Sequence, residues 1–127
     1  MAAICPDVGE KVLLEKILED NYVLKIYKND YTPSESTVLG DLQECDVAGY
    51  APVTLVAGTW DVQQSGGQTF GVYKDIKFTF TAGSRNYGYY ITNAVNQLIF
   101  VESFGGEPIS NPVGGGELIL DITVSLQ

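Results

Sequence analysis

The strongest constraint in this sequence is a two-residue alternation of apolar and polar side chains, which begins near Asn21 and recurs to the C-terminus. In the segment 74–81, Ile76, Phe78 and Phe80 fall on one face, and in the segment 118–126 every second residue is apolar. Such alternation is typical of strands with one buried face. The chain from residue 21 onward is therefore predicted to be all-β.

Turn-forming residues divide this part of the chain into short strands. Strands are predicted at 22–28, 42–47, 53–56, 60–63, 74–81, 87–92, 97–104 and 118–126. Strands separated by turn signals at intervals of about 8–12 residues favour an antiparallel β-sandwich. Because the number of predicted strands is close to that of a jelly roll, we expect a jelly-roll-like sandwich over residues 21–127.

The first twenty residues have a helical pattern instead. Asp7 is placed to cap a helix over residues 8–18, with Glu10 completing a capping box. Four apolar residues form one stripe on this helix: Leu13, Leu14, Ile17 and Leu18. A helix this short needs tertiary contacts to be stable. We expect residues 1–20 to form an arm that reaches a neighbouring subunit, with packing on its own domain as the alternative.

The chain is acidic, with 16 acidic and 7 basic residues and a net charge of −9. No basic residue lies between Lys28 and Lys74, whereas six acidic residues lie in the range 30–61. Such a charge repels phosphate backbones, so we expect no nucleic-acid partner. The acidic region is consistent either with a basic protein partner or with a solvated surface.

The chain contains no histidine, which removes Ser-His-Asp and Cys-His catalysis and histidine-ligated zinc. Cys5 and Cys45 lack a CxxC partner and are expected to be free thiols. No nucleotide-binding loop is present. We therefore expect a protein that is not an enzyme and that needs neither a metal nor an organic cofactor.

Two weaker possibilities involve acidic side chains. Glu44 and Asp46 alternate onto one face of a predicted strand and could form an acid–base pair. Three loop acids could contribute to a weak calcium site, although no EF-hand pattern occurs: Asp30, Glu35 and Asp41. For both sets, solvated surface residues are the favoured interpretation.

Eight tyrosines are present in this small domain. Tyrosine suits interfaces that are half wet, and it also suits sugar-binding platforms or the rim and core of a sandwich. Beside the four apolar residues of the helix, the candidate partner contacts are Tyr31, Tyr50, Arg85 and Tyr87.

The N-terminus lacks the basic start and the long apolar stretch of a secretory signal, and no apolar run approaches the length of a membrane span. Synthesis in a cytoplasm, without a membrane partner, is the expectation.

Four segments together resemble a group of small virion structural proteins of tailed bacteriophages. They are LKIYKNDYTP at 24–33, GYAPVTL at 49–55, YGYYIT at 87–92 and ESF at 102–104. The resemblance implies a capsid decoration (cement) protein, which binds the outside of the phage head and stabilises it by bridging capsomers. Its partners would be the major capsid protein and other copies of itself, as a trimer. A glycan-binding β-sandwich module and a tail or adaptor component are the alternatives.

Overall fold

The computed structural model describes residues 1–126, which contain one helix, one short 3-10 turn and nine strands. The helix is α1 (Asp7–Ile17) and the 3-10 turn is η1 (Leu39–Asp41). The strands are β1 (Tyr22–Tyr27), β2 (Val53–Leu55), β3 (Asp61–Ser65), β4 (Gln68–Phe80), β5 (Ser84–Asn86), β6 (Gly88–Thr92), β7 (Leu98–Ser103), β8 (Ile109–Asn111) and β9 (Gly116–Ser125).

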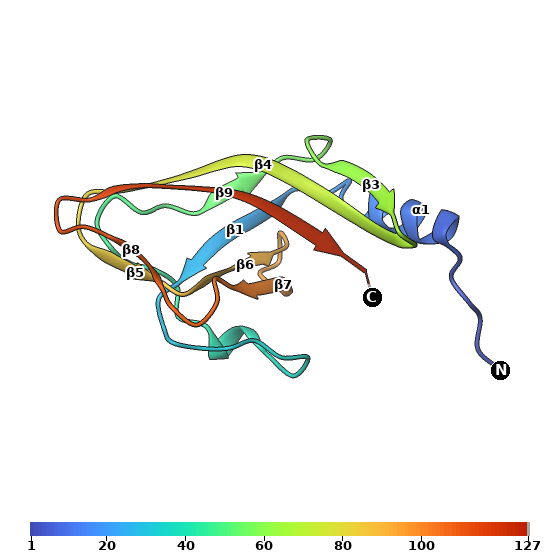
Figure 1. Ribbon diagram of the computed structural model, residues 1–127, viewed down its shortest axis with the longest axis horizontal. Coiled ribbons are helices and arrows are strands. Elements are labelled where there is room, and N and C mark those ends of the chain that lie inside the picture. Colours follow the sequence, from blue (N-terminus) through green and yellow to red (C-terminus); the bar gives the residue numbers. More distant parts are fainter. Residues whose placement is uncertain (127) are drawn as a thin grey trace.

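All strand pairs are antiparallel, which confirms the all-β prediction. One sheet has the order β2-β1-β6-β7, a second has the order β3-β4-β9, and β5 pairs with β8. The long β4–β9 pair runs along the molecule, and β1, β6 and β7 lie beside it (Figure 1). The two larger sheets contribute to one hydrophobic core.

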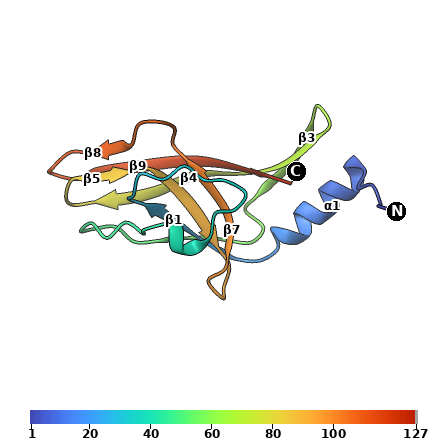
Figure 2. The same ribbon diagram turned by 90° about the horizontal axis from the view of Figure 1, so that it is seen from below.

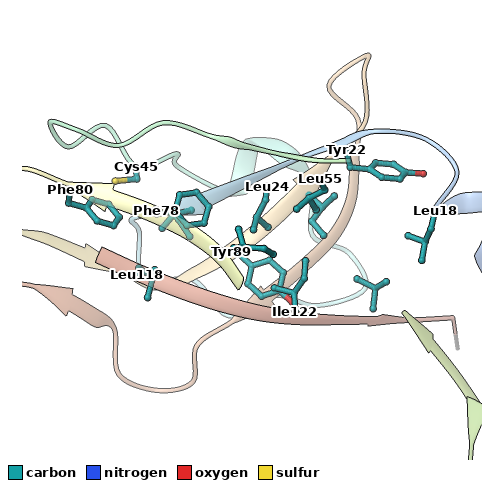
Figure 3. Packing of buried hydrophobic residues seen from close by; sticks show 14 of the residues in the cluster. Leu18, Tyr22, Leu24, Cys45, Leu55, Phe78, Phe80, Tyr89, Leu118 and Ile122 are labelled. Carbon is teal, nitrogen blue, oxygen red and sulfur yellow. The ribbon is translucent and has the colours of Figure 1, made fainter. Parts of the chain in front are cut away.

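The buried faces of the strands are those that the alternation predicts. Ile76, Phe78 and Phe80 of β4 are all buried, as are Leu118 and Ile122 of β9. They meet side chains of the other sheet, which in Figure 3 point toward them from β1, β2 and β6: Leu24, Leu55 and Tyr89. Burial of apolar side chains on facing sheets is the main stabilising term in such a fold.

The β4–β9 ladder contains a β-bulge. Two residues of β4 stand opposite one residue of β9 between the pairs Tyr73–Ile122 and Ile76–Leu120. Asp75 in this bulge has a φ of 59°, and its N–H donates a hydrogen bond of 2.9 Å to the Asp121 carboxylate. The extra residue changes which alternate residues of β4 face the core, and it bends the strand.

Several strand predictions differ from the structure. Segment 42–47 is not a strand and contacts β1 through a single bridge between Tyr27 and Glu44. Residues 68–73 belong to β4 but were not predicted as a strand. The prediction missed them because the bulge shifts the alternation between the two halves of β4. The three-residue strands β5 and β8 are too short to give a period.

The predicted capping box is also wrong. The N-cap residue of α1 is Pro6, which makes no side-chain cap, and Asp7 is already helical. The Asp7 carboxylate therefore lies in the first turn, where a negative charge is favourable next to the positive end of the helix dipole.

Helix α1 packs on its own domain. Leu14 and Leu18 are buried in the main core, and the helix contacts β3 and β4. Leu18 lies where a side chain at Gly71 would stand, since a Cβ there would come within 2.6 Å of its Cδ1. Within this chain the helix therefore packs on the sandwich, as the alternative had it, and a contact of residues 1–20 with a neighbouring subunit stays a prediction.

Two neighbouring leucines of α1 test this packing. Leu14 has no exposed surface, whereas Leu13 is 52% exposed. We expect Leu14→Ala to lower the free energy of unfolding by about 2–5 kcal/mol, because it leaves a cavity in the core. Leu13→Ala, the matched control, should cost less than about 1 kcal/mol. Urea unfolding measures both, and equal losses would contradict the packing of α1.

Candidate docking surface

The end of the molecule that carries the N-terminus has an exposed apolar surface. The N-terminal segment, residues 1–6, is exposed throughout and leads into α1. On α1, Val8 and Val12 are 72% and 66% exposed, and Leu13 is half exposed. Figures 1 and 2 show α1 and the N-terminal segment projecting at this end, with the C-terminal end of β9 on the same side. We call the N-terminal segment with Val8, Val12 and Leu13 the N-terminal surface.

The N-terminal surface includes the outward side of α1, whose inward side packs on the core of the same chain. Leu14 and Leu18 are one turn apart and cover the core, and Ile17 packs beside them. Val8 and Val12 are also one turn apart, but on the solvent side. Leu13 lines a shallow depression with Cys5, Glu10 and Leu126. The helix therefore has two apolar stripes, of which its own domain covers one.

The structure separates the four helix residues that were predicted to contact a partner. Leu14 and Leu18 are buried within their own chain, and Ile17 is half-buried against the same core. Only Leu13 is free to meet a partner. Val8 and Val12 were missed, although their spacing of four residues is itself a helical signal. This signal was overlooked because the four-residue apolar stripe between Leu13 and Leu18 is larger.

Tyr50 is part of the core rather than a contact residue. Its ring stacks on Phe78 at a centroid distance of 5.9 Å and an interplanar angle of 8°. Its hydroxyl donates a hydrogen bond of 2.9 Å to Glu44 and accepts one of 3.2 Å from the Ile26 N–H. The ring and the hydroxyl of Tyr50 therefore both have partners within the chain, and its role as a partner contact stays a prediction.

The other predicted contacts lie elsewhere. The Tyr31 hydroxyl bonds to Thr37 and Asp41, so it holds the 29–41 loop together. Tyr87 is half-buried beside a small second core around Tyr27. Arg85 is exposed on β5, at the opposite end of the molecule from α1 (Figure 2). The structure does not bring these residues together with Leu13.

None of the eight tyrosines is exposed. Burial and the nearby carboxylates of Asp30 and Glu102 raise the pKa of Tyr27 to about 12. Burial, with a smaller effect of Glu44, raises the pKa of Tyr90 to about 12. A sugar-binding platform needs exposed rings, so the tyrosines supply none.

Three of the five acidic side chains considered as sites contact different partners. Asp46 pairs with Lys28 at 2.9 Å, and this hydrogen bond holds the pKa of the Asp46 carboxyl below its usual value. Glu44 instead accepts the Tyr50 hydroxyl. Asp41 accepts the Val38 N–H and the Tyr31 hydroxyl. Over residues 1–126, no three acidic or cysteine side chains are grouped as metal ligands would be.

Comparison with protein-family models, with curated proteins and with solved structures finds no match. In the described part of the chain, no helix has the length and apolar character needed to cross a membrane. The candidate surface therefore has to be interpreted from its own residues.

The buried tyrosines predict how stability depends on pH. Their folded-state pKa is raised above the unfolded value of about 10, so their contribution is complete below about pH 10. We expect the urea midpoint to fall as the pH rises from about 10 to about 12. Tyr90→Phe should reduce this fall. A midpoint that stays constant across the range would contradict the prediction.

Proposed function

We propose that this protein is a non-enzymatic capsid decoration protein of a tailed bacteriophage. It binds the outside of the phage head and stabilises the head by bridging capsomers. Its partners are the major capsid protein and other copies of itself, and its location is the capsid surface, reached after synthesis in the host cytoplasm. The observation that carries the proposal is the exposed apolar N-terminal surface, where Ile4, Val8, Val12 and Leu13 lie together at one end of the molecule.

The composition of the N-terminal surface supports a protein partner. Exposed Ile4, Val8, Val12 and Leu13 gain roughly 1–2 kcal/mol each when a partner covers them. Such a contact is weak for one subunit after the costs of association. It becomes strong when many copies engage a repeating lattice, because linked contacts raise the effective affinity. A capsid shell provides that repetition.

The phage assignment is supported by the resemblance of segments 24–33, 49–55, 87–92 and 102–104 to virion structural proteins. The jelly-roll-like arrangement is part of the proposal, supported by two antiparallel sheets that share one core. The charge of −9 keeps such a protein soluble until it meets its lattice. A glycan-binding function has less support, because four of the eight tyrosines are buried and the other four are partly buried.

The decisive experiment replaces the outward valines of α1. We expect the double variant Val8→Gln, Val12→Gln to remain folded and to bind phage heads lacking this protein at least about tenfold more weakly, since the roughly 2–4 kcal/mol of apolar burial lost at the two sites exceeds the about 1.4 kcal/mol of a tenfold change. Cosedimentation with such heads measures the binding.

The matched control is the double variant Val95→Gln, Val113→Gln. These loop valines are 73% and 91% exposed and undergo the same change of side chain. The control should bind heads as the unaltered protein does. Equal binding by both double variants would contradict the role of the N-terminal surface. Recovery of the protein in a few copies on tails would support the tail or adaptor alternative instead.

A further inference from the structure

Strand β9 has an open edge. Its ten residues pair with β4 on one side, and the described residues provide no second strand neighbour. Within the described residues 1–126, residues 117–125 make no backbone–backbone hydrogen bond outside the β4–β9 ladder. In an antiparallel strand, alternate residues direct their N–H and C=O groups away from the paired side. About half of the backbone groups of β9 therefore face the open edge.

This edge has few of the features that prevent pairing between proteins. Natural edge strands are protected by charged side chains, especially lysine, by prolines, bulges or great shortness, or by a covering helix or loop. The two acidic side chains of β9, Glu117 and Asp121, are held by Lys77 and by the Asp75 N–H of β4. Residues 117–126 contain no lysine, proline or glycine, and the bulge of this ladder lies in β4. Ile119 on the outer face is 59% exposed. Long, regular and unprotected, the edge of β9 is suited to accept another strand.

We infer that two copies of this chain associate by antiparallel pairing of their β9 edges about a two-fold axis at Ile122. The two β3-β4-β9 sheets then form one continuous sheet across the dimer. The pairing covers residues 118–126 of each copy. This inference does not depend on the proposed function.

Of axes at Leu120, Asp121 and Ile122, the axis at Ile122 brings the fewest like charges together. With that axis, Asp121 of one copy stands opposite Thr123 of the other and diagonally beside the second Asp121, and Ile119 stands opposite Ser125. An axis at Asp121 would place the Asp121 carboxylates of the two copies directly opposite each other, and like charges in that position are destabilising. An axis at Leu120 would bring Asp121 diagonally beside Glu117 of the second copy as well.

The apolar pattern favours the same register and identifies the occupant as a second copy. On the inner face, Leu118 stands opposite Leu126 of the other copy, and Leu120 opposite Val124. Leu120 and Leu126 are only half-buried within one chain, unlike Leu118 and Val124. Each half-buried leucine is thus covered by a side chain of the same strand in the second copy, a self-complementarity that a two-fold axis requires.

Two substitutions of adjacent residues test the dimer. Leu120→Lys places a charge on the inner face of the edge, which blocks edge pairing. Ile119→Thr replaces the adjacent apolar residue on the outer face without adding a charge, so it should leave edge pairing intact. We expect sedimentation to show a dimer for the unaltered protein and for Ile119→Thr, and half that mass for Leu120→Lys with an unchanged circular dichroism spectrum.

Cysteine cross-linking tests the register without relying on the folding of Leu120→Lys. Both chains carry Cys5→Ser, and Cys45 stays because it is buried. Residues directly opposite in an antiparallel pair have the Cα separation that a disulfide needs. We expect mild oxidation of an equal mixture of Ile119→Cys and Ser125→Cys to give cross-linked dimers, and either variant alone to give few.

A monomer at all accessible concentrations overturns the inference. A trimer without dimers, the state expected from the resemblance to decoration proteins, overturns it as well. Cross-linking that is absent from the mixture, or equally strong in each variant alone, rejects the register at Ile122.

Discussion

The antiparallel ladder between β4 and β9 runs the length of the molecule and holds the rest of it in place. Its inner face supplies Phe78, Phe80 and Leu118 at one end of the core and Ile122 near the other. Sheet β2-β1-β6-β7 packs across that face, and α1 covers the part of the ladder near Gly71. Without the ladder neither the second sheet nor the helix would have an apolar surface on which to pack.

The bulge at Asp75 adapts this ladder to two different coverings. Before the bulge, Thr69 and Gly71 are buried, and Gly71 leaves room for Leu18 of the helix. After it, the larger side chains Ile76 and Phe78 are buried against the second sheet. One inserted residue thus changes which residues of the strand face inward, where the covering changes from a helix to a sheet.

The two surfaces assigned to binding are consequences of how the ladder is covered. One apolar stripe of helix α1 packs on β3 and β4, whereas Val8 and Val12 remain exposed on the outer side of the helix. The sheet ends at β9, so the edge of that strand stays open. One surface offers apolar side chains and the other offers backbone groups. They can therefore serve different contacts, with a lattice and with a second copy.

Sequence reasoning was most successful where one face of a strand is buried over several residues. The inward faces of β9 and of the second half of β4 were predicted correctly, because burial on one side imposes a period of two. It failed for segment 42–47, where apolar residues are held by a turn and a single bridge. It also could not show the intrachain partners of Tyr50, because Phe78 is distant in the sequence and Glu44 lies in a segment without regular secondary structure.

The sequence by itself therefore determined the class of the fold, the short helix and the absence of histidine chemistry, since these follow from local periodicity and composition. Only the tertiary structure decided which apolar residues are available to a partner. Leu14 and Val12 are equally apolar and two residues apart, yet the first is buried and the second exposed. That difference depends on which side of α1 meets β4, and this contact joins residues far apart in the chain.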